Sequence, residues 1–191
     1  MLSKPIKIKN VVPQHLFDSL QDEFDHSGWS LGNKSYNQKW QRDGFTMADL
    51  PANRPIIFNI ASYIKLKIQR YIKHDLAFIR AHVNGYVYGQ TGGFHQDFVE
   101  YRTYTFIMFT HENWNMQWGG EFVCYDESAQ DYKFFPALPN TGVLIPSDWD
   151  HYGAAPNEYA NCMRSTIGFS FCDPSVKEYM SEVCAQVKYF T

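Results

Sequence analysis

"LAFIRAHVNGYVYGQTGGFHQDFVEYRTYTFIMFT", residues 76–110, contains two segments rich in β-branched and aromatic residues, with a glycine-containing stretch between them. Segments of this composition are typical of β-strands when Gly, Pro, Asn and Asp separate them. Three more follow: "GEFVCYD" (120–126), "TGVLIPSD" (141–148) and "RSTIGFSFCD" (164–173). We therefore predict an antiparallel sandwich or jelly roll over residues 76–172.

Helix signals lie outside this strand block. Leu16, Phe17, Leu20 and Phe24 indicate a short amphipathic helix, and a longer one is indicated by Ile57, Ile60, Ile64, Ile68 and Tyr71. Asp173 and Pro174 resemble an N-cap and a first-turn proline, before a stripe formed by Val176, Met180, Val183 and Val187. Helices outside the strand block would cover one sheet face, which gives an α+β fold.

The composition predicts one domain over residues 1–191. Its expected parts are a helical part at about 1–75, a jelly-roll core at about 76–172 and a C-terminal helix at about 174–188. The net charge of −3 and the lack of a basic run argue against nucleic acid or an anionic membrane as a partner. No apolar run approaches a membrane span and no signal-peptide core is visible, so we expect a soluble cytoplasmic protein. The oligomeric state is left open.

Four cysteines, Cys124, Cys162, Cys172 and Cys184, contain no C-x-x-C pair. A structural zinc site is therefore not indicated. In a reducing compartment we expect these residues to act as small buried hydrophobes.

His95 and Asp97 lie one residue apart in "FHQD". On a strand their side chains would point the same way, so that both can bind one metal ion. A third ligand must come from a distant segment, and "SDWDHYGAAP" (147–156) offers His151. Two histidines and one carboxylate are the ligand set of non-heme Fe(II) oxygenases. H-x-D alone is a weak pattern, which a solvated strand face or an ordinary hydrogen-bonded His–Asp pair would also explain. Four other candidate histidines outside the centre of the strand block have no second ligand nearby and are expected at the surface: His15, His26, His74 and His111.

Arg164 and Thr166 share one face of their predicted strand, whereas Ile167, Phe169 and Phe171 share the other. The apolar face suits a core under the helices. An arginine on the inner face requires an anionic partner, and a guanidinium with a neighbouring hydroxyl suits a small dicarboxylate. An exposed edge strand with a solvated arginine is the alternative.

In combination these motifs resemble the Fe(II)/2-oxoglutarate-dependent dioxygenases, in particular their prolyl 4-hydroxylase-like branch with its small phage and bacterial members. The resemblance covers roughly residues 78–172, in the order H-x-D, distal His and R-x-T. Three further stretches agree with it: "VNGYVYGQTGGFHQD", "YTFIMFTHENWNMQWGGEF" and "PNTGVLIPSDWDHYG". It implies a double-stranded β-helix (jelly roll) with N-terminal helices and a C-terminal helix packed on the major sheet.

The same resemblance implies the site. His95, Asp97 and His151 would bind Fe(II), and Arg164, assisted by Thr166, would hold the distal carboxylate of 2-oxoglutarate. Tyr86 would line the cosubstrate pocket, with plain packing as its alternative, and L-ascorbate is a further candidate cofactor. Family chemistry converts 2-oxoglutarate and O₂ to succinate and CO₂ and hydroxylates a C–H bond. Many relatives carry a tyrosine where this chain has Phe109, so cosubstrate anchoring should depend more on Arg164 and Thr166.

The substrate is less well indicated. Prolyl residues of a peptide or protein are the first hypothesis, and a free amino acid or small metabolite is the second. Nucleobase repair is disfavoured because "RSTIGFSFCD" lacks a second arginine, and a cupin-like binding module would not need Arg164. Region 27–52 is either a substrate lid or a packed loop. Four aromatic residues could border the site or simply pack beneath loops: Tyr36, Trp40, Trp114 and Trp118.

Overall fold

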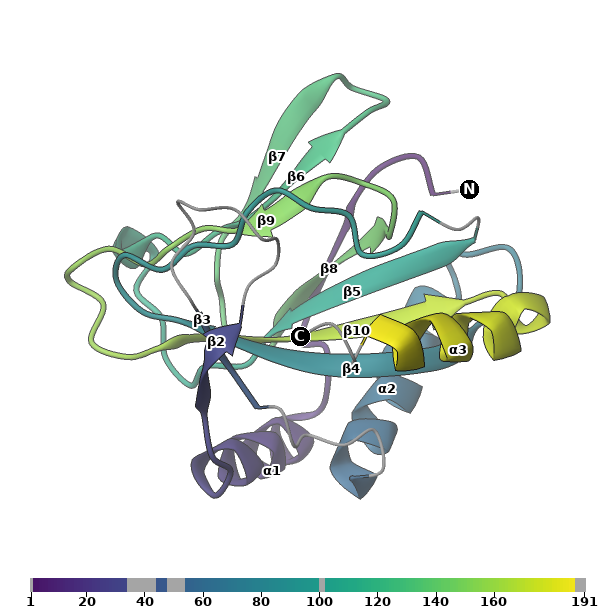
Figure 1. Ribbon diagram of the computed structural model, residues 1–191. Coiled ribbons are helices and arrows are strands. Elements are labelled where there is room, and N and C mark those ends of the chain that lie inside the picture. The colour runs from purple at the N-terminus through teal and green to yellow at the C-terminus, as the bar shows by residue number, and fades with distance from the viewer. Residues whose placement is uncertain (1, 34–43, 48–53, 100–101, 188–191) are drawn as a thin grey trace.

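The computed structural model describes residues 2–33, 44–47, 54–99 and 102–187, with the backbone alone for 183–187 (Figure 1). Its helices are α1 (Gln14–Asp25), α2 (Pro55–Ile68) and α3 (Lys177–Val187), with short 3₁₀ turns η1 (Met116–Trp118) and η2 (Pro174–Val176). Its strands are β1 (Ile6–Lys9), β2 (Ser30–Asn33), β3 (Gly44–Thr46), β4 (Ala77–Tyr86), β5 (Thr103–Phe109), β6 (Phe122–Asp126), β7 (Asp131–Phe135), β8 (Thr141–Pro146), β9 (His151–Gly153) and β10 (Arg164–Cys172).

Two antiparallel sheets form the centre of the molecule. The major sheet has seven strands in the order β1-β8-β5-β10-β4-β3-β2, and the minor sheet has three in the order β7-β6-β9. In Figure 1, α1 and α2 lie on one side of the major sheet and the minor sheet lies on the other. The α+β jelly-roll prediction is therefore confirmed. The region around residues 27–52, expected to be irregular, also contributes β2 and β3 to the major sheet.

The helix-facing side of the major sheet forms the larger core. Ile167, Phe169 and Phe171 of β10 are fully buried there with the isoleucines of α2. The predicted α2 stripe is confirmed at Ile57, Ile60, Ile64 and Ile68. Its last member, Tyr71, was predicted wrongly: α2 ends at Ile68, Tyr71 is 37% exposed, and Ile72 is buried instead.

The C-terminal helix packs against β4 of the major sheet. Asp173 accepts a hydrogen bond from the Ser175 N–H at 3.0 Å, which confirms the predicted cap, although it begins the 3₁₀ turn that leads into α3. Met180 of the predicted stripe is buried. The side chains of Val183 and Val187 lie outside the described residues.

Cys124 and Cys172 are buried as predicted, but Cys162 is exposed, because it lies in the loop before β10 rather than in a strand. The Cys184 side chain lies outside the described residues. Within the described residues, no helix combines the length and the apolar character needed to cross a lipid bilayer.

Candidate metal and dicarboxylate site

The H-x-D segment lies against the start of β9. His95 and His151 form an antiparallel bridge, in which each backbone N–H donates to the other residue's carbonyl at 3.1 and 3.0 Å. The Asp97 N–H donates to the Ser147 carbonyl at 3.0 Å. The segment therefore makes one bridge rather than the full strand that the sequence indicated. These backbone bonds still bring three side chains from distant parts of the chain together.

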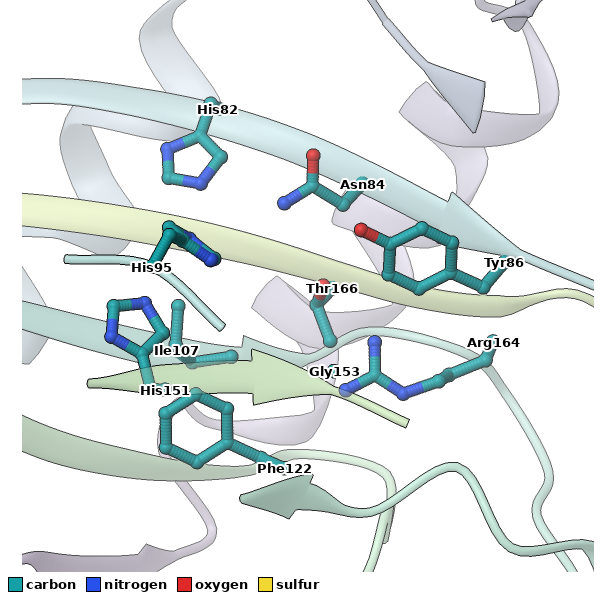
Figure 2. A pocket seen from close by; sticks show the side chains of 10 residues that line it. All are labelled: His82, Asn84, Tyr86, His95, Ile107, Phe122, His151, Gly153, Arg164 and Thr166. Atoms are coloured by element: carbon teal, nitrogen blue, oxygen red, sulfur yellow. The ribbon is translucent and has the colours of Figure 1, made fainter. Parts of the chain in front are cut away.

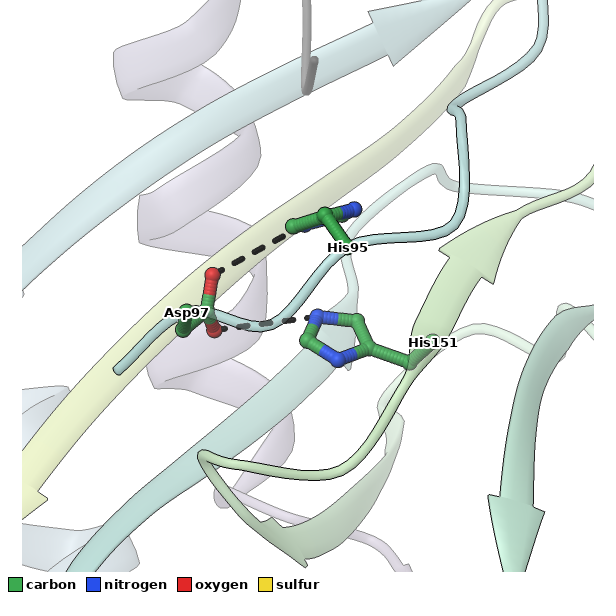
Figure 3. A group of neighbouring side chains, drawn as sticks. All are labelled: His95, Asp97 and His151. Atoms are coloured by element: carbon green, nitrogen blue, oxygen red, sulfur yellow. Dashed lines mark ion pairs between the residues drawn. The ribbon is translucent and has the colours of Figure 1, made fainter. Parts of the chain in front are cut away.

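The three side chains converge as metal ligands would (Figure 3). His95 Nε2 lies 3.7 Å from Asp97 Oδ1, and His151 Nε2 lies 3.7 Å from Asp97 Oδ2. The candidate ligand atoms all lie within 4.8 Å of one another. His95 Nδ1 donates to the Gly93 carbonyl and His151 Nδ1 to the Trp149 carbonyl, both at 2.8 Å. These bonds leave each Nε2 as a free lone pair, the tautomer that a metal ligand needs.

The protonation preferences of the His95–Asp97–His151 cluster also suit a divalent cation. Burial by itself raises the pKa of Asp97, but the imidazoles of His151, His82 and His95 and the Thr105 hydroxyl together hold that pKa below its usual range. Burial lowers the pKa of His151, which favours its neutral form. Metal binding requires an ionised carboxylate and neutral imidazoles. The residues present therefore fit an Fe(II) ion.

Thr105 of β5 hydrogen-bonds to the Asp97 carboxylate. Its hydroxyl donates to Asp97 Oδ2 at 2.6 Å and lies 3.0 Å from the Ser147 hydroxyl. Outer partners of this kind orient the ligand, and their loss typically costs about 10- to 100-fold in metal affinity. We expect Thr105→Val to weaken Mn(II) binding by an amount in this range, measured by equilibrium titration. Unchanged Mn(II) affinity with an unchanged melting temperature would show that this hydrogen bond does not orient Asp97.

A trough runs along the inner face of the major sheet from His95 and His151 to Arg164 (Figure 2). It contains about 340 Å³ of empty space, including the part open to solvent. It is lined by His82, Asn84, Tyr86, His95, Ile107, Phe122, His151, Gly153, Arg164 and Thr166. His95 and His151 lie at one end, and Tyr86 and Arg164 at the other.

Arg164 is a buried cation without an ion pair to any described carboxylate. Its side chain is 1% exposed, and its Nε donates to the Gly120 carbonyl at 2.5 Å. Burial lowers its pKa to about 10, so the guanidinium remains protonated at neutral pH. No carboxylate of the described residues forms an ion pair with it. β10 lies between β5 and β4, so the edge-strand alternative is wrong.

Aromatic rings and glycines surround the guanidinium. Its carbon lies 5.8 Å from the ring centre of Tyr86 and 5.2 Å from that of Phe109, close enough for cation–π attraction. A Cβ at Gly153 would lie 3.1 Å from Arg164 Nη1. One at Gly120, where φ is +77°, would lie 2.9 Å from Trp114 Cζ2 and 3.2 Å from Arg164 Cδ. Gly120 thus leaves room for both Trp114 and Arg164.

The structure also shows what the sequence missed. His111 is buried rather than exposed: its Nε2 lies 2.8 Å from the Ala137 carbonyl, and its ring packs on Trp114 with a centroid distance of 4.4 Å. His15 and His26 are exposed as expected, and His74 is half-buried. Trp114 and Trp118 pack edge-to-face at 5.3 Å and do not line the trough. Tyr36 and Trp40 lie outside the described residues.

Comparisons with known proteins agree with this geometry. Residues 81–169 match the family model described as the 2OG-Fe(II) oxygenase superfamily. A search of curated proteins finds no match to the sequence. Among solved structures, a Pseudomonas putida prolyl-4-hydroxylase aligns with a TM-score of 0.64 and 13% identity, over 88% of this chain and 91% of that one.

Two further structures extend the comparison. A prolyl hydroxylase from Trichoplax adhaerens, in complex with a peptide fragment of the hypoxia-inducible factor oxygen degradation domain, aligns with a TM-score of 0.71 and 16% identity, over 93% of this chain and 87% of that one. HygX from Streptomyces hygroscopicus, with nickel and 2-oxoglutarate bound, aligns with a TM-score of 0.68 and 9% identity, over 91% of this chain and 84% of that one. At these identities the similarity shows a shared fold.

Proposed function

Because this chain belongs to the 2OG-Fe(II) oxygenase superfamily, we propose that it hydroxylates prolyl residues of a peptide or protein. The resemblance inferred from the sequence is confirmed at the level of the family: the chain is an Fe(II)/2-oxoglutarate-dependent dioxygenase. Its fold is similar to that of prolyl hydroxylases.

We assign the following roles to the site residues. His95 and His151 present their Nε2 lone pairs to the metal, and Asp97 supplies the negative charge. Arg164 pairs with the distal carboxylate of 2-oxoglutarate, Thr166 adds a hydroxyl, and Tyr86 closes the pocket on one side. When bound, Fe(II) and 2-oxoglutarate supply the oxidative chemistry, which consumes O₂ and yields succinate and CO₂ together with a hydroxylated product. The protein contributes positioning and shelter from water.

One observation carries this proposal: a single trough joins a His–Asp–His cluster to a buried arginine without an anionic partner in the described residues. A ligand with a carboxylate at Arg164 and a second set of oxygen atoms at the metal would satisfy both ends. A cupin-like binding module has no need for a buried guanidinium without an ion pair to a described residue. The arginine therefore favours a dicarboxylate-dependent enzyme.

The choice of prolyl peptides rests on the prolyl hydroxylases among the similar structures, one of which is bound to a peptide. A second candidate, hydroxylation of a small metabolite, is favoured by a structure of HygX with hygromycin B bound. The fold similarity supports both.

Mass spectrometry separates the two candidates. The protein would be incubated with Fe(II), 2-oxoglutarate, ascorbate and air, with proline-containing peptides in one set and free amino acids in another. We expect proline-containing peptides to gain the mass of one oxygen atom, and alanine-substituted peptides to gain nothing. Modification of free amino acids alone, with peptides untouched, would favour the second candidate and contradict the first.

A further inference from the structure

His82 lines the trough, but none of the roles assigned above involves it. It comes from β4, and its side chain lines the trough at the end that holds His95 (Figure 2). Its Nδ1 is buried and has no hydrogen-bond partner among the described residues. That nitrogen has no exposed surface, whereas the other ring nitrogen, Nε2, is turned toward the trough (Figure 2), where the oxygen atoms of a ligand could accept a hydrogen bond from it.

The sheet is built to hold this imidazole. Gly168 of β10 lies directly opposite His82 in the antiparallel register. A Cβ at Gly168 would lie 2.4 Å from His82 Cε1 and 2.7 Å from Nε2, which is closer than atoms can approach. The glycine therefore leaves the space that the ring occupies. Its position in the middle of a fully buried strand has no other evident reason.

His82 is not an additional metal ligand. The described residues whose ligand atoms cluster closely enough to share one ion are His95, Asp97 and His151. The imidazole instead lies beside them, over the trough, while Arg164 lies at the far end. A dicarboxylate held at Arg164 would bring its other end below His82.

We propose that His82 donates a hydrogen bond to the carboxylate–ketone end of 2-oxoglutarate. This inference rests on the proposed function. Both oxygen groups at that end accept hydrogen bonds, and an imidazole carries at least one N–H in either protonation state. At the other end, Phe109 has no hydroxyl to offer. His82 thus adds a polar contact where the cosubstrate meets the metal.

The test measures binding rather than turnover. The dissociation constants of Mn(II), and of 2-oxoglutarate on the Mn(II)-loaded protein, would be determined by calorimetry. His82→Phe keeps a ring over Gly168 but removes both nitrogens, and we expect 2-oxoglutarate to bind roughly tenfold more weakly or worse, with unchanged Mn(II) affinity. His82→Gln retains an N–H donor and should recover most of the affinity. Ser170 lies on β10, two residues after Gly168. Ser170→Ala removes a hydroxyl without a described partner and serves as the matched control.

Gly168→Ala is an independent test, because the added Cβ would displace the His82 ring without changing its chemistry. This variant should also bind 2-oxoglutarate more weakly. Parental 2-oxoglutarate affinity in His82→Phe would overturn the inference about His82 while leaving the proposed function intact. Weakened Mn(II) binding in His82→Phe would also overturn it, because His82 would then support the metal. If the parent protein itself binds no 2-oxoglutarate, both proposals are wrong.

Discussion

Asp97→Ala is expected to abolish succinate formation from 2-oxoglutarate. The substitution removes the only carboxylate of the His95–Asp97–His151 cluster and leaves two imidazoles, which bind a divalent cation far more weakly. The fold should persist, because the backbone bonds of this segment do not involve the carboxylate. His95→Ala and His151→Ala should have the same result. Succinate assays and Mn(II) titration of the purified variants measure both effects.

A matched control is available in the same region. Asp148 is exposed and lies three residues before His151 in the sequence, so Asp148→Ala removes a nearby carboxylate without touching the cluster. It should turn over 2-oxoglutarate as the parent does. An Asp97→Ala protein with parental Mn(II) affinity and succinate production would show that the ligands have been assigned wrongly.

Arg164→Ala is expected to raise the 2-oxoglutarate concentration needed for half-maximal binding by a large factor. Removing one partner of a buried ion pair costs about 2–5 kcal/mol, because the remaining carboxylate stays desolvated and unpaired. Thr166→Val should cost less, on the order of 1 kcal/mol for one hydrogen bond. Both constants would be measured by calorimetry on Mn(II)-loaded protein.

Two controls distinguish a binding defect from a folding defect. Arg164→Lys keeps the charge but loses the planar, two-pronged donor, so its affinity should lie between those of the parent and Arg164→Ala. Lys133→Ala removes a cation that pairs with Asp131 on β7 and does not line the trough, and it should leave binding unchanged. If Arg164→Ala and Thr166→Val both bind 2-oxoglutarate like the parent, the dicarboxylate lies elsewhere.

The polar and apolar faces of β10 were predictable because their signals are local. The alternation of Arg164 and Thr166 with Ile167 and Phe169 along one strand revealed a polar and an apolar face, and both are observed. Every-fourth-residue spacing in α2 likewise predicted its buried side. The spacing of apolar residues indicates which face of a helix or strand is buried, even when the segments that pack against it are not known.

Features that depend on pairing between distant segments were not predictable. β1 pairs with β8, and the Gly168 that accommodates His82 belongs to a different strand, so neither relation leaves a local pattern. His111 was expected at the surface because it lacks a second ligand in sequence, yet Trp114 and the Ala137 carbonyl enclose it. The prediction that Tyr71 belongs to the buried stripe was wrong because α2 ends at Ile68. A periodic pattern does not mark where a helix ends.

Anaerobic calorimetric titration of 2-oxoglutarate into the Fe(II)-loaded parent protein tests whether the trough is the cosubstrate site. The trough predicts saturable binding at one site, strongly reduced when the metal is removed by a chelator and strongly reduced again in Arg164→Ala. Each end of the cosubstrate would then need its own partner. Absence of binding in the Fe(II)-loaded parent protein, or binding that is indifferent to both the metal and Arg164, would contradict the assignment of this trough as the cosubstrate site.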